Sequence, residues 1–128
     1  MDADPATLAR IAHDEGLRRS DMWRDLVAQH QATDEQAEAD ELVWYEMEMF
    51  FRWRARQPGV CWTWSVPTTP LETMAKAARR ALTKLLQRHQ DPDAQICRHA
   101  RDLHQLTVWL ETCFHPRPQR QIELDLAA

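Results

Sequence analysis

Residues 71–89 read LETMAKAARRALTKLLQRH and form the most regular stretch of the chain. Apolar side chains recur every three or four residues along it, at Leu71, Met74, Ala75, Ala78, Leu82, Leu85 and Leu86, with His89 continuing the line. Side chains three and four positions apart share one face of an α-helix. The segment therefore predicts an amphipathic helix that begins directly after Pro70 and packs its apolar face into a core.

The rest of the chain also favours helices. Only two glycines are present, whereas Ala, Leu, Arg, Gln, Glu and Met are abundant. Capping residues and breaks predict further helices over about 6–16, from Ser20 or Asp21 to about 28, over about 34–56 and over about 93–114. The expected fold class is all-α, a compact bundle of four to five helices.

The helix expected over 34–56 is unusually apolar in its second half. Its apolar residues cover more than one face and are Leu42, Val43, Trp44, Tyr45, Met47, Met49, Phe50, Phe51 and Trp53. Such a helix either lies at the centre of a fold or also contacts another chain. We favour central burial, with an exposed aromatic edge at Trp44 and Tyr45 that is left for a partner.

Two segments fall outside the predicted helices. Residues 57–70 read QPGVCWTWSVPTTP, and their alternating valines and tryptophans predict an extended loop that crosses the helices through Trp62 and Trp64. Residues 115–128 begin with HPRP and should leave the body of the domain. We therefore expect one helical domain over 1–114 and a flexible C-terminal tail over 115–128.

Composition indicates a small globular protein. The 128 residues suffice for one core, and 44% hydrophobic and 28% charged residues are globular values. No apolar run has the length that a bilayer crossing needs, and the acidic N-terminal residues are unlike a secretory signal. The cysteines Cys61, Cys97 and Cys113 lack zinc-type spacing and are expected to be reduced thiols. These features predict a cytoplasmic location.

Charge is divided unequally along the chain. Residues 1–48 carry thirteen acids against four arginines, a balance of −9, and residues 49–128 carry twelve bases against seven acids, a balance of +5. The two halves either neutralise each other inside the fold or face different partners. The sequence leaves both arrangements open.

A positive ridge follows the outer face of the 71–89 helix. It consists of Lys76, Arg80, Lys84 and Arg88 at intervals of four residues, with Arg79 beside them. Side chains four apart lie above one another, so the ridge is straight and matches a phosphate backbone. It predicts nucleic-acid binding, unless the face is merely solvated or is neutralised by the acidic helix over 34–48.

The acidic helix is a candidate protein-binding surface. Asp34, Glu38 and Glu41 stand on it beside the aromatic edge, among further carboxylates that the helix dipole stabilises. The surface could meet a basic protein or imitate a phosphate backbone. Imitation predicts an inhibitor or regulator from a mobile element that blocks a protein partner.

Residues 8–27 resemble a helix-turn-helix. Ala12 and Gly16 are four apart, as the turn of that motif tends to require, but Glu15 and Asp25 stand where it has buried apolar residues. The resemblance covers these twenty residues only. It implies a DNA-binding regulator whose second helix enters the major groove.

The tail carries a short motif, QIELDL over 121–126. It resembles the six-residue peptide by which bacterial replication and repair proteins dock on the sliding clamp. The resemblance implies that the Gln121 amide and the side chains of Leu124 and Leu126 make the contact, with Ile122 in place of the more usual leucine. An exposed tail is where such a peptide can be reached.

Little in the sequence points to catalysis. The six histidines are scattered, and Cys97 with His104 supplies two of the four ligands that a zinc site needs. No phosphate-binding glycine loop and no nucleophile motif are present. We therefore expect no enzyme, no cofactor and no metal.

The function predicted from the sequence is that of a non-enzymatic accessory subunit of bacterial or phage nucleic-acid machinery. It would bind a protein partner and the nucleic-acid backbone, away from membranes, and homo-oligomerisation stays open. The alternatives are the inhibitor or regulator and the helix-turn-helix DNA reader.

Overall fold

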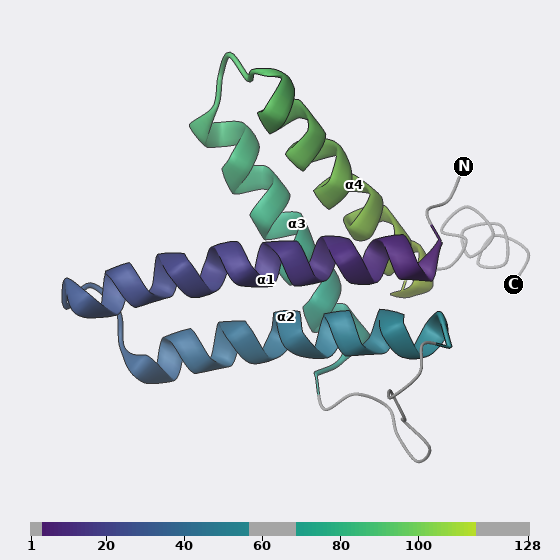
Figure 1. The fold of residues 1–128 in the computed structure, drawn as a ribbon, viewed down its shortest axis with the longest axis horizontal. Coiled ribbons are helices and arrows are strands. Elements are labelled where there is room, and N and C mark those ends of the chain that lie inside the picture. The colour runs from purple at the N-terminus through teal and green to yellow at the C-terminus, as the bar shows by residue number, and fades with distance from the viewer. Residues whose placement is uncertain (1–3, 57–68, 115–128) are drawn as a thin grey trace, which may run out of the picture.

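The computed structural model describes residues 4–56 and 69–114, which form four helices. They are α1 (Pro5–Ala28), α2 (Asp34–Arg54), α3 (Leu71–Arg88) and α4 (Ala94–Phe114). Helices α1 and α2 form one antiparallel hairpin, α3 and α4 form a second, and the two hairpins cross (Figure 1). No strand occurs in the described ranges, so the predicted all-α class is confirmed. The loop at 57–68 and the tail at 115–128 lie outside the described residues.

Helix α1 begins where the sequence predicts a start. The Asp4 side chain accepts a hydrogen bond from the Thr7 backbone N–H at 2.8 Å, and Pro5 occupies the first helical turn. This cap satisfies one of the N–H groups that a helix leaves without a partner at its N-terminus. The helix then continues for 24 residues to Ala28.

The predicted break near Gly16 is wrong. Gly16 lies inside α1 and faces α2, where a Cβ added to it would meet the Trp44 Cβ at 3.7 Å. A glycine in a helix interior costs only about 1 kcal/mol, which packing along the length of α2 can offset. Residues 8–27 therefore contain no turn, and the two-helix geometry of the motif that they resemble is not present.

Helices α2 and α4 start at the caps that the sequence indicates. The Thr33 hydroxyl accepts from the Gln36 backbone N–H at 3.1 Å, and the Gln36 side chain accepts from the Thr33 backbone N–H at 3.0 Å. This reciprocal pair is a capping box. At α4, the Asp93 carboxylate accepts from the Ile96 backbone N–H at 2.8 Å.

The core lies where the hairpins meet, and every helix contributes to it. Its fully buried large side chains are Leu8, Trp44, Met47, Phe51, Met74, Leu103, Leu106 and Leu110. The second half of α2 is thus central, as predicted. Leu86 and His89 were expected on the inner face of α3, but both are exposed, because α4 and the other hairpin cover a narrower stripe than the full apolar spacing suggests.

None of the described helices combines the length and the apolar character that a membrane crossing requires.

Candidate nucleic-acid interface

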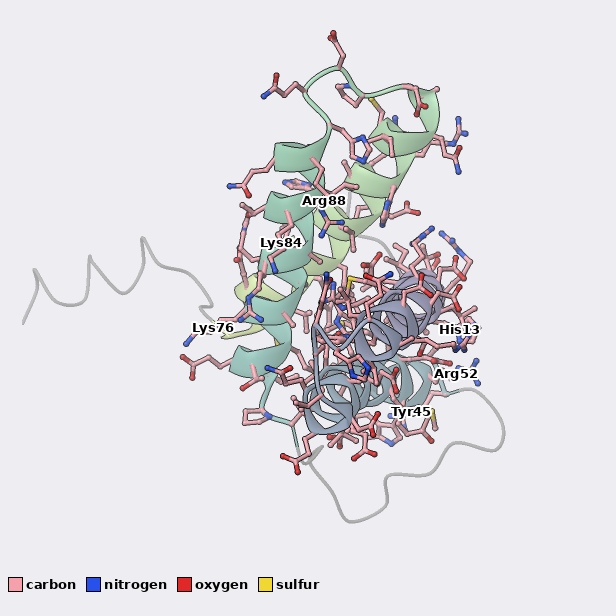
Figure 2. The ribbon with its side chains drawn as sticks, turned by 90° about the vertical axis from the view of Figure 1, so that its left-hand side faces the viewer. His13, Tyr45, Arg52, Lys76, Lys84 and Arg88 are labelled. Carbon is pink, nitrogen blue, oxygen red and sulfur yellow. The ribbon has the colours of Figure 1, made fainter. Side chains whose placement is uncertain are left out.

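The predicted basic ridge forms on α3. Lys76, Arg79, Arg80, Lys84 and Arg88 are all exposed. Figure 2 shows Lys76 to the left of α3, with Lys84 and Arg88 placed progressively toward its right as the helix rises. From Lys76 to Arg88 the ridge is about 18 Å long, given a rise of about 1.5 Å per residue.

Two ridge residues have carboxylate partners. Lys76 Nζ lies 3.2 Å from Glu72 Oε1 on its own helix, an exposed pair of the kind that contributes little. Arg79 donates from Nη2 and Nε to the Glu111 carboxylate on α4 at 2.6 and 3.0 Å. These hydrogen bonds raise the pKa of Arg79, and partial desolvation opposes them. Arg79 therefore fastens α3 to α4.

The other three ridge cations are available. Arg80, Lys84 and Arg88 form no ion pair with any residue in the described part of the chain. They are also exposed, so their charge is presented to solvent.

Three carboxylates of α2 contact α1, and a fourth, Glu46, accepts hydrogen bonds from Thr69 before the start of α3. Asp40 accepts two hydrogen bonds from Arg19, at 2.6 and 3.3 Å. Glu41 accepts one from Ser20 at 3.3 Å, and Glu48 lies 3.1 Å from His13 Nδ1. Within the described residues, the acidic helix thus leaves the ridge unneutralised.

A groove runs beside the ridge, between α1 and α3. Its volume is about 350 Å³. Met22, Trp23 and Leu26 line it from α1, and Lys84, Leu85 and Arg88 line it from α3. We call it the α1–α3 groove. It extends the positive surface of the ridge toward the N-terminal hairpin.

A second groove of about 550 Å³ lies between α1 and α4. Its cationic residues are Arg10, Arg18, Arg98 and Arg101, accompanied by the carboxylates Asp14 and Asp102. Arg18 and His99 line both grooves. The positive surface therefore continues from α3 past Arg18 to α4.

A buried carboxylate holds the residues between the grooves. Glu15 is only 6% exposed, and its Oε1 lies 2.7 Å from His99 Nε2 and 3.2 Å from Arg18 Nη1. Arg19 lies 3.7 Å from its other oxygen. Because the Nε2 proton of His99 is directed at Glu15, the 3.3 Å approach of Arg18 to the same nitrogen is a contact and not a second hydrogen bond. Glu15 thereby fixes a cation and an imidazole at the junction.

Comparisons with protein-family models, curated proteins and solved structures found no match to this chain.

The predicted protein-binding residues of α2 differ in how exposed their side chains are. Trp44 is 1% exposed and lies in the core, so the predicted aromatic edge does not include it. Tyr45 is 58% exposed, and Asp34 and Glu38 are exposed as well. Glu41 is half-buried against Ser20.

Several sequence candidates receive no structural description. Gln121, Leu124 and Leu126 of the tail, and Trp62 and Trp64 of the loop, lie outside the described residues. Among the residues that are described, no three His, Cys, Asp or Glu side chains converge in a way that could hold a metal ion.

Sequence reasoning did not identify the residues between the grooves. Arg18 and His99 are 81 positions apart, so their proximity depends on how the hairpins cross. One signal was present in the sequence: Glu15 follows Leu8, Ile11 and Ala12 on their apolar stripe. A carboxylate in such a position needs charged partners when it is buried.

Proposed function

We propose that the protein binds the phosphate backbone of nucleic acid through the α3 ridge and acts as a non-enzymatic accessory subunit of nucleic-acid machinery. The observation that carries this proposal is that Arg80, Lys84 and Arg88 are exposed and form no ion pair within residues 4–56 and 69–114. Clustered cations attract phosphates through their local field, even when the net charge of the whole protein is −4.

The proposal predicts a salt-dependent affinity for oligonucleotides. Changing Lys76, Arg80 and Lys84 together to Glu should abolish binding at near-physiological salt, because the phosphate contacts are replaced by repulsion. Each lost phosphate contact should also reduce the steepness of log affinity against log salt by about 1. The measurement is fluorescence anisotropy of a labelled oligonucleotide over a salt series, with circular dichroism to verify the fold.

A matched pair of single variants controls for net charge. Arg80→Glu and Arg24→Glu change the charge of the protein equally, but Arg24 stands on α1 with a 76% exposed side chain, away from both grooves. Only Arg80→Glu should weaken binding. Absence of binding at low salt, or equal weakening by both variants, would contradict a role for the ridge.

A second surface favours a protein partner, which is the other half of the predicted function. Leu17, Leu42 and Tyr45 are 56%, 49% and 58% exposed on the α1–α2 hairpin. Leu17 is two positions from Glu15, so it points about 200° around α1 from the side that lines the α1–α3 groove. Exposed apolar side chains that gather beside carboxylates are typical of interaction sites. We call these residues with Asp34, Glu38 and Glu41 the outer face.

The outer face also supports the alternative of an inhibitor that blocks a partner. Changing Asp34, Glu38 and Glu41 together to Lys should release a basic partner, while the ridge variant should retain it. Co-purification from the native host, compared by mass spectrometry between the two variants, separates the roles. Partners that are lost equally from both variants would argue against a distinct outer face.

The DNA-reader alternative finds less support. Its motif requires a turn between two helices, whereas residues 8–27 lie within the single helix α1. Clamp docking through Gln121, Leu124 and Leu126 stays a proposal, and loss of clamp affinity on changing Leu124 and Leu126 to Ala would support it.

A further inference from the structure

The α1–α3 groove has an apolar wall, unlike the open ridge. Met22, Trp23 and Leu26 supply it from α1, and Ala81 and Leu85 from α3. Trp23 is half-buried and contributes an aromatic side chain to the wall. Any base can stack on an indole, because every base has an aromatic face. The apolar wall therefore suits a base better than a charged phosphate.

The rim of the groove is cationic. Its lining residues include four basic side chains, Arg18, Arg19, Lys84 and Arg88, against one carboxylate, Glu15. Lys84 and Arg88 are unpaired within the described residues, and the Arg18 side chain is 52% exposed. The rim therefore retains positive charge for an anion after the Glu15 contacts are made.

The groove is held in place before any ligand arrives. Trp23 donates from Nε1 to Asp40 at 2.7 Å, and the same carboxylate is held by Arg19 at 2.6 Å. Glu15 anchors Arg18 at 3.2 Å. Fixed side chains lose little conformational entropy on binding, which favours affinity.

We propose that the α1–α3 groove holds one nucleotide, with its base against Trp23 and Leu26 and its phosphate on Lys84 and Arg88. A volume of about 350 Å³ fits this occupant, since pockets for small ligands start at about 300 Å³. The nucleotide is either one unit of a single strand or a free mononucleotide. This inference rests on the proposed function and excludes a duplex as the occupant, because bases stacked in a duplex cannot enter a pocket.

The test compares a single-stranded oligonucleotide with its duplex, by anisotropy at one salt concentration. The wild-type protein should bind the single strand more tightly by about 5- to 150-fold, the range expected for stacking of a base on an aromatic side chain. Trp23→Ala should remove this preference and leave duplex binding by the ridge intact.

A second variant controls for the hydrogen bond between Trp23 and Asp40, which Trp23→Ala also removes. Leu26→Glu leaves that bond in place and puts a carboxylate on the apolar wall, where the base is expected, so it should also remove the preference. Its matched control is Leu86→Glu, because Leu86 is 50% exposed and points about 200° around α3 from Lys84. The control should bind both probes as the wild type does.

Adding a mononucleotide as competitor shows whether the nucleotide in the groove is a unit of a single strand or a free mononucleotide. A single-strand preference that Leu26→Glu removes supports a unit of a strand as occupant. Mononucleotide binding that Leu26→Glu removes, without a single-strand preference, supports the free nucleotide. Equal affinity for single strand and duplex with no mononucleotide binding overturns the pocket, although the ridge proposal survives. Absence of binding to every oligonucleotide at low salt overturns the ridge proposal itself.

Discussion

Replacing Arg19 by Ala is expected to lower the free energy of unfolding by about 1–3 kcal/mol, the cost of leaving a part-buried charged group without one of its hydrogen-bond partners. The Arg19 side chain is 16% exposed and its partners Asp40 and Glu15 are 15% and 8% exposed. Asp40 would keep the Trp23 N–H and lose its guanidinium, whereas Glu15 would keep Arg18 and His99 and lose only the 3.7 Å contact with Arg19. The measurement is chemical denaturation at neutral pH.

The geometry of the pair supplies two informative comparisons. Arg19 donates to both oxygens of Asp40, at 2.6 and 3.3 Å, and a lysine cannot reproduce this two-bond arrangement. Arg19→Lys should therefore recover part of the loss and not all of it. Arg24→Ala is the surface control: its partner Asp21 is 75% exposed, and a change of about 0.5 kcal/mol or less is expected. An Arg19→Ala effect as small as that of the control would show that the network does not stabilise the fold.

The helix limits that the sequence predicts correctly are those with strong local signals. Thr33 and Asp93 are cap residues whose side chains bond to the backbone three positions later. The start of α3 after Pro70 depends on a fixed backbone angle. In each case the information lies within one helical turn, so no tertiary contact is needed to infer it.

Gly16 shows where local information fails. Taken alone, glycine with its low helix propensity favours a break, but the position lies against Trp44 of the next helix, and packing against α2 keeps α1 continuous. Leu86 shows the converse error. Its spacing matches the buried stripe, yet only the hairpin geometry decides how wide the covered stripe is.

The candidate site divides in the same way. The ridge is predictable because four-residue spacing within one helix places Lys76, Arg80, Lys84 and Arg88 in one row, which slants by about 40° per step. The sequence does not predict that the acidic helix leaves the ridge unneutralised, since this depends on α2 facing α1. The grooves depend on the crossing of two hairpins and therefore appear only in the folded chain.

The uneven charge of the sequence is thus only partly neutralised in the fold. The acidic half is partly neutralised, by its own Arg19 on Asp40 and by Arg52 of the basic half, which lies 2.7 Å from Glu48. The ridge of the basic half is neutralised only at Lys76 and Arg79 in the described residues. What is left is a positive surface along α3 and a carboxylate-bearing outer face on the other hairpin.

Replacing Phe51 by Ala is the second large effect expected, a loss of about 3–5 kcal/mol. Phe51 is fully buried on α2, and its ring meets the Trp109 ring of α4 edge to face, with centroids 4.9 Å apart. Because the contact joins one hairpin to the other, the resulting cavity weakens the crossing on which both grooves depend. Denaturation followed by far-ultraviolet circular dichroism and by tryptophan fluorescence measures it.

Two comparisons decide whether Phe51 acts by filling this junction. Phe51→Leu keeps most of the buried volume and should cost less than about 1.5 kcal/mol, whereas Leu86→Ala on the exposed side of α3 should cost about 0.5 kcal/mol or less. If the hairpins depend on each other, the two probes should give one coincident transition in the wild type and in Phe51→Ala. Separate transitions, with the tryptophan signal lost first, would show that each hairpin is stable without the other and that Phe51 is not the link between them.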